Sequence, residues 1–120
     1  MSLTINYESL NEETKKKFQT LTQFGQTLEI LTQQKLQIDS NIRETELAIE
    51  SLTEATPDTP VYKSIGGVMV KSTRDKLLDE KNSNKETLTM QSKTLAQKIE
   101  RTKSTFENMQ KSLQEELQNQ

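Results

Sequence analysis

Carboxylates, which could do acid–base chemistry, are plentiful in this sequence, with 18 Asp and Glu residues. The 120 residues include neither histidine nor cysteine, which excludes imidazole bases, thiol nucleophiles and thiolate metal sites. Carboxylate pairs such as Glu46 and Glu50 are four residues apart, the spacing of neighbours on a solvated helix surface. The pattern implies no cleft in which their pKa values could be shifted for acid–base work.

The adjacent glycines Gly66 and Gly67 do not indicate a phosphate-binding loop, because they lack its spacing and the Lys-Ser or Lys-Thr that follows it. We therefore expect no enzyme activity, no catalytic residue, no cofactor and no metal. The remaining candidate for function is apolar surface, and the helices and strands of the chain must position it.

Composition favours a narrow seam over a wide core. The chain is 30% hydrophobic and 4% aromatic, whereas an ordinary globular domain is roughly 45–50% apolar. A seam between two helices needs only two apolar positions in seven. The formal net charge is -2 with both signs interspersed, which indicates no nucleic-acid partner. No apolar run suits a membrane, and the N-terminus does not resemble a signal peptide, so we expect a cytoplasmic protein.

Two heptad series predict one domain over residues 1–120, built on a long antiparallel two-helix coiled coil. Helix one is expected over residues 9–54, from a capping box at Ser9, and helix two over residues 72–118, from a similar box at Ser72. Residues 55–60 form a linker with two prolines. The first series is Leu21, Phe24, Leu28, Leu31, Lys35, Ile38, Ile42, Thr45, Ile49 and Leu52. The second is Leu78, Lys81, Lys85, Leu88, Ser92, Leu95, Ile99, Thr102, Phe106, Met109 and Leu113.

The two series are expected to fold back in one register, in which Leu52 faces Leu78 and Phe24 faces Phe106. Some layers of this seam are polar, namely Lys35 with Leu95, Ile38 with Ser92, and Thr45 with Lys85. We interpret them as lysine stems that reach out to solvent and as polar positions that fix the register at some cost in stability.

Residues 61–71, VYKSIGGVMVK, predict a β-hairpin between the helices. Gly66 and Gly67 can both take positive φ, as a two-residue type I′ turn requires, and this turn pairs Ile65 with Val68 and Lys63 with Val70. Alternation along the strands predicts two faces. One carries Val61, Ile65, Val68 and Val70; the other carries Tyr62 and Met69, with Ser64 and Lys71.

An isolated hairpin is marginal in water and leaves two open edges. The helices lead away from it, so we expect hairpins of several chains to join into a shared β-barrel. A hairpin folded back onto its own coil is the alternative. The expected oligomerisation residues are Val61, Tyr62, Ile65, Gly66, Gly67, Val68, Met69 and Val70.

These features resemble the prefoldin family, and in particular its archaeal beta-type subunit. The resemblance rests on VYKSIGGVMVK between two long heptad segments and on the preceding linker Pro57-Asp58-Thr59-Pro60. A single hairpin resembles the beta type, although Gly67 and Met69 depart from the bulkier aliphatic pattern of that family.

The resemblance implies a hexamer of two alpha-type and four beta-type subunits, whose hairpins form a barrel. Such an assembly is an ATP-independent chaperone that captures unfolded client polypeptides between its coil tips. It delivers them to a group II chaperonin. The implied partners are therefore an alpha-type subunit, further copies of this chain, unfolded clients and the chaperonin.

Toward the chain termini the predicted seam includes polar and charged residues: Lys17 is expected to face Leu113, and Thr14 to face Glu116. We expect these helix ends to fray and to expose apolar groups, which suits weak, promiscuous binding of unfolded chains. Ordinary fraying of termini is the alternative. The candidate client-binding residues are Leu10, Phe18, Met109, Leu113 and Leu117, with Leu3, Ile5 and Tyr7 ahead of the helix.

Two other function classes remain open at this point. A coiled-coil scaffold or oligomerisation protein without chaperone activity would explain both helices, but it gives no reason for an open-edged hairpin. A nucleic-acid-binding arm would need clustered Lys and Arg, which here alternate with acidic residues.

Overall fold

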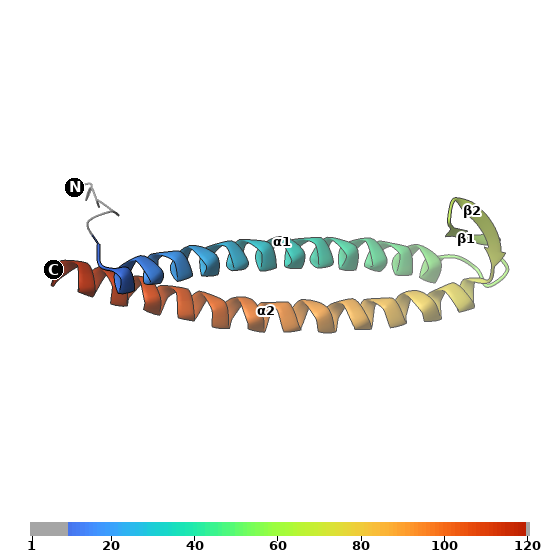
Figure 1. The fold of residues 1–120 in the computed structure, drawn as a ribbon. Helices are drawn as coiled ribbons and strands as arrows, with labels where there is room; N and C mark the ends of the chain where they lie inside the picture. Colours follow the sequence, from blue (N-terminus) through green and yellow to red (C-terminus); the bar gives the residue numbers. More distant parts are fainter. Residues whose placement is uncertain (1–9, 120) are drawn as a thin grey trace. The chain divides into compact units, whose positions relative to one another are not determined.

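The computed structural model describes residues 10–119 of the chain. The element order is α1 (Glu12–Glu54), β1 (Val61–Ile65), β2 (Val68–Ser72) and α2 (Arg74–Gln118) (Figure 1). The fold is mostly helical, with two long helices joined through one antiparallel hairpin. This confirms the fold class expected from the heptad series and the central strand signal.

The chain divides into two compact units. One comprises Met1–Gln33 and Ala96–Gln120, and the other comprises Gln34–Leu95 and contains the hairpin. Within each unit a segment of α1 lies beside a segment of α2 (Figure 1). The expectation of a single domain over the whole chain stays a prediction.

The seam follows the predicted heptads. Every member of both series is buried or partly buried, whereas most positions between them are exposed. Leu31 and Leu113 are the most deeply buried members, and Leu77 is buried beside the predicted seam residue Leu78. Because only one narrow stripe of each helix is covered, the apolar surface that stabilises this coil is small for the length of the chain.

Both helices begin later than predicted, because other residues cap them. Helix α1 begins at Glu12, and the Asn11 side-chain oxygen accepts a hydrogen bond from the Thr14 backbone N–H at 2.8 Å. The expected cap Ser9 lies outside the described residues.

At α2 the expected cap Ser72 pairs with Val61 in the hairpin, so its backbone is committed to a strand. The Thr73 hydroxyl takes the capping role and accepts from the Lys76 backbone N–H at 3.2 Å.

Candidate assembly site

The hairpin has the predicted turn and register. Gly66 and Gly67 have φ of 53° and 82°, both in the left-handed region that a type I′ turn needs and that favours glycine. Ile65 pairs with Val68, as expected. The ladder continues through Lys63 with Val70 to Val61 with Ser72.

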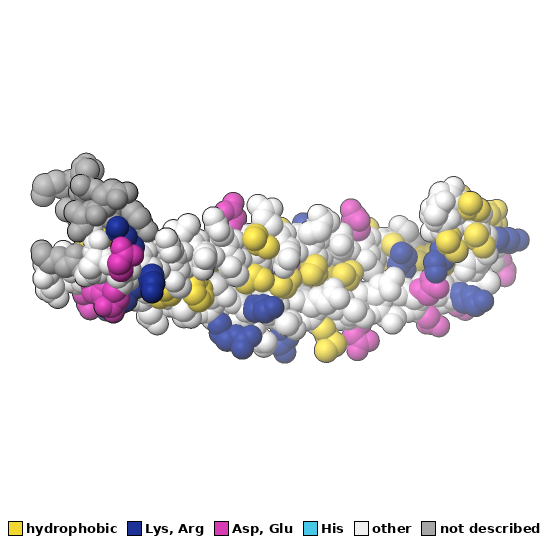
Figure 2. All heavy atoms as spheres, viewed as in Figure 1, with side chains coloured by type: hydrophobic (Ala, Val, Ile, Leu, Met, Phe, Trp, Pro, Cys, Tyr) yellow, Lys and Arg dark blue, Asp and Glu magenta, His cyan; other side chains and the backbone are white. Residues whose placement is uncertain are grey.

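The apolar side chains of the hairpin are largely open to solvent on both faces. Directly paired residues share a face, so the predicted face of Val61, Ile65, Val68 and Val70 also carries Lys63 and Ser72. Val68 is 62% exposed on this face, and Met69 is 64% exposed on the other. Figure 2 shows hydrophobic side chains gathered on the surface of the hairpin. Since only β1 and β2 make up the sheet, each strand also has one unpaired edge.

An ion pair links the hairpin to its own coil. The Lys63 ammonium forms an ion pair with Glu80 of α2 at 2.9 Å, and Val61 is partly buried. An exposed pair of this kind contributes about 0–1 kcal/mol. Ile65, Val68 and Val70 remain exposed, so the contact with α2 does not cover the apolar face.

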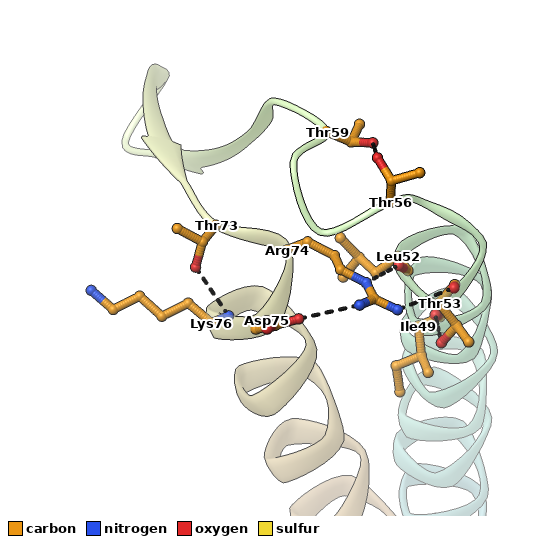
Figure 3. A network of polar contacts seen from close by, with 9 residues as sticks. All are labelled: Ile49, Leu52, Thr53, Thr56, Thr59, Thr73, Arg74, Asp75 and Lys76. Carbon is orange, nitrogen blue, oxygen red and sulfur yellow. Dashed lines mark hydrogen bonds and ion pairs between the residues drawn. The ribbon is translucent and has the colours of Figure 1, made fainter.

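Arg74, the first residue of α2, ties the base of the hairpin to the end of α1. Its Nε donates to the Leu52 carbonyl at 2.9 Å, and a terminal guanidinium nitrogen donates to the Thr53 carbonyl at 3.3 Å (Figure 3). The other terminal nitrogen donates to Asp75 at 3.3 Å. The last carbonyls of a helix have no partner within it, and here one guanidinium satisfies two of them.

Arg74 therefore holds together the two helix ends from which the strands leave. Sequence reasoning missed this role: the predicted register brings the start of helix two near the end of helix one, but it does not show that the Arg74 side chain reaches the carbonyls of residues 52 and 53. The only available signal was the position of an arginine in the first helical turn, where the positive end of the helix dipole disfavours a cation.

The candidate client-binding residues at the helix ends are less exposed than expected. Leu10, Phe18, Met109 and Leu117 are partly buried. Leu113 is only 4% exposed, and Thr14 only 1%. The expectation that Leu113 is open to solvent is therefore wrong: α2 stays helical to Gln118, so Leu113 continues the seam. Leu3, Ile5 and Tyr7 lie outside the described residues.

A charged contact closes these ends. The Lys17 ammonium donates a hydrogen bond to the Glu116 carboxylate, joining α1 to α2 where Lys17 was expected to face Leu113. This hydrogen bond raises the pKa of Lys17 above its ordinary value, with a smaller contribution from the charge of Glu116.

Within residues 10–119, no cluster of three or more acidic side chains could hold a metal ion. No helix among the described residues is long and apolar enough to cross a membrane. The features that remain are the exposed hairpin and the seam of the coil.

Together they define a coiled-coil protein that presents an open-edged, apolar hairpin. The sequence profile described as prefoldin subunit matches residues 12–120. The chain belongs to this family, whose members are chaperone subunits that assemble into prefoldin complexes.

The similar proteins are archaeal subunits of the beta type. The prefoldin subunit beta of Archaeoglobus fulgidus is 34% identical over 94 residues, which cover 78% of this chain and 81% of that protein. The prefoldin subunit beta of Methanothrix thermoacetophila is 34% identical over 97 residues, which cover 81% of each. In fold, the chain matches the crystal structure of the prefoldin beta subunit from Thermococcus strain KS-1. The TM-score is 0.82 at 23% identity, over 91% of this chain and 96% of that one.

Proposed function

We propose that this chain is a beta-type subunit of an ATP-independent holdase, which binds unfolded polypeptides in the cytoplasm and delivers them to a group II chaperonin. The observation that carries the proposal is the hairpin of a prefoldin-family chain, with exposed apolar side chains on both faces and two unpaired edges. Such a surface is stable in water only when another chain covers it.

The partners in this proposal are an alpha-type prefoldin subunit and further copies of this chain, in a hexamer of two alpha and four beta subunits. Hairpins that join edge to edge in a barrel would satisfy the free N–H and C=O groups of β1 and β2. They would also bury Ile65, Val68 and Val70, which the coil leaves open.

Client binding is proposed at the ends of α1 and α2, through Leu10, Phe18, Met109, Leu113 and Leu117. Four of these side chains are partly accessible with the ends closed. Leu113 contributes only when the ends separate, because it is buried otherwise. The ion pair between Lys17 and Glu116 adds little resistance to that separation, since both groups are partly exposed.

Native mass spectrometry of this chain, alone and with an alpha-type subunit, tests the assembly. We expect a mixed hexamer that suppresses aggregation of an unfolded client without ATP. A dimer of this chain that does not bind the alpha-type subunit and does not reduce client aggregation would contradict the proposal. It would instead support a coiled-coil scaffold. Transfer is tested separately, by following a labelled client from the hexamer to a purified group II chaperonin.

A further inference from the structure

Two polar seam residues in the hairpin-containing unit turn toward the same carboxylate. The Lys35 ammonium donates to Asp39 at 2.7 Å, and the Ser92 hydroxyl donates to the other oxygen of Asp39 at 2.6 Å. The hydrogen bonds from Lys35 and Ser92 hold the pKa of Asp39 below its ordinary value. Asp39 is next in sequence to the seam residue Ile38 and therefore lies at one flank of the seam.

Two apolar seam residues, Ile38 and Leu95, are partly buried and line the other flank. Ile38 was expected to face Ser92, and Leu95 to face Lys35, so each has a partner engaged with Asp39. Ile38 and Leu95 form the apolar floor of an open groove between α1 and α2, which neither Lys35 nor Ser92 lines. The complete lining is Gln34, Gln37, Ile38, Thr87, Met90, Gln91, Thr94 and Leu95.

The lining has no charged side chain, in a chain of which 28% is charged. Its polar members are glutamines and threonines, whose amides and hydroxyls can donate to and accept from peptide groups. Met90 is 66% exposed and offers a flexible, polarisable contact that adapts to different side chains. An uncharged groove of this kind matches an apolar, uncharged polypeptide segment and offers no ion pair to a charged surface.

We propose that this groove, lined by the eight residues above, is a second binding surface for apolar segments of unfolded polypeptides, apart from the helix ends. The inference rests on the proposed holdase function and extends it to the side of the coil. A client segment held here would be retained by weak apolar contact and by hydrogen bonds to its backbone, without sequence selectivity.

The sharpest test fills the groove without loosening the coil. In Thr94→Arg, a long charged side chain stands in the groove and blocks client contact with Leu95, while the exposed position 94 lies outside the seam and away from Asp39. We expect the assembled complex to keep its melting temperature while its affinity for an unfolded client falls about fivefold, as the loss of one apolar contact predicts. Lost binding in a complex that melts no earlier cannot be explained by unfolding.

A matched pair of surface variants gives an independent measurement. Met90→Glu places a charge at the rim of the groove, where the Met90 side chain is 66% exposed. Leu47→Glu places a charge at a position that is 63% exposed and does not line the groove. We expect Met90→Glu to weaken client binding about fivefold or more and Leu47→Glu to leave it within twofold. Equal effects of the two variants would overturn the proposal.

Because the chain has no cysteine, a single Cys can carry a photo-crosslinker at one chosen place. A probe at Gln91→Cys should label a bound client, and one at Leu47→Cys should not. Crosslinks from position 91 to a second copy of the chain, with none to client, would overturn the groove proposal. A wild-type complex that binds no client would instead refute the holdase function itself. Client binding that every groove variant leaves unchanged would overturn only the groove.

Discussion

The hairpin and the helix ends differ in how far their apolar side chains are exposed to solvent. At the hairpin, Ile65, Val68 and Met69 are more than half exposed. At the helix ends, Leu113 is buried, and the ion pair of Lys17 with Glu116 joins the two helices. Both regions were expected to expose apolar surface; the hairpin exposes most of it, whereas the helix-end side chains are buried or only partly accessible while the coil is closed.

The difference follows from what each backbone can cover by itself. Two antiparallel helices each supply a stripe for the other, so an apolar residue that continues the heptad finds a partner within the chain. A two-stranded sheet has no second layer and leaves two edges open. Exposure at the hairpin is therefore permanent in the isolated chain, whereas exposure of Leu113 requires the helix ends to separate.

The largest expected effect concerns the hairpin. Val68→Glu combined with Val70→Glu should prevent assembly while helix content, measured by circular dichroism, stays largely intact. The loss of two buried valines alone weakens association by about 3 kcal/mol, roughly a hundredfold, and burial of the new charges adds to this. Sedimentation of the variant with an alpha-type subunit measures the effect. A persistent hexamer would show that the hairpin face is not the interface.

The next largest effect separates two leucines at the helix end. Leu113→Ala should lower the free energy of unfolding by about 2–5 kcal/mol, because it removes a buried side chain and leaves a cavity. Leu117→Ala, at a partly exposed position, should cost clearly less. Urea titration of both variants measures the difference. Equal costs would mean that Leu113 is not buried in solution, as a frayed end would require.

A smaller effect is expected at the base of the hairpin. Arg74→Ala removes the donors to the Leu52 and Thr53 carbonyls and should destabilise the coil by about 1–3 kcal/mol. Arg74→Lys should restore only part of this, since an ammonium cannot reproduce the geometry of the guanidinium fork. Thermal melting of both variants provides the measurement, with the exposed Arg101→Ala as a control. Equal melting temperatures of Arg74→Ala and wild type would show that Arg74 does not stabilise the end of α1.

The smallest effect is the pH dependence of the helix ends. The pKa of Lys17 is raised in the folded chain. At a pH between the unfolded and folded pKa values, the folded state therefore binds more protons than the unfolded state. The stabilisation is complete below the unfolded pKa near 10.5 and is lost as pH rises through the folded value. Chemical unfolding between pH 9 and 12 should show this decline, and Lys17→Met should reduce it. An unchanged slope in the variant would exclude Lys17 as its source.

Local pattern predicted the parts of the molecule that depend on short-range rules. Heptad spacing correctly predicted buried or partly buried positions from Leu21 to Leu52 and from Leu78 to Met109, although it missed the buried Leu77. Two adjacent glycines between alternating strands identified the turn and the pairing of Ile65 with Val68. These rules hold because the period of each element depends on its own backbone and needs no distant contact.

Local pattern did not predict which of several polar groups makes a contact. Ser72 and Thr73 both suit a helix cap, and pairing of Ser72 with Val61 across the hairpin decides between them. Near the middle of α1, the sequence shows polar layers, but it does not show that Asp39 accepts hydrogen bonds from both Lys35 and Ser92.

By itself, the sequence determined two heptad helices, a glycine-turned hairpin between them and an apolar hairpin face that the coil cannot cover. Period and turn chemistry are local properties and can be read from neighbouring residues. Only the tertiary structure decided that Leu113 is buried, that Arg74 reaches the end of α1 and that one flank of the coil opens into an uncharged groove. Each of these depends on which side chains meet across the two helices, and that choice is made by packing between residues far apart in the chain.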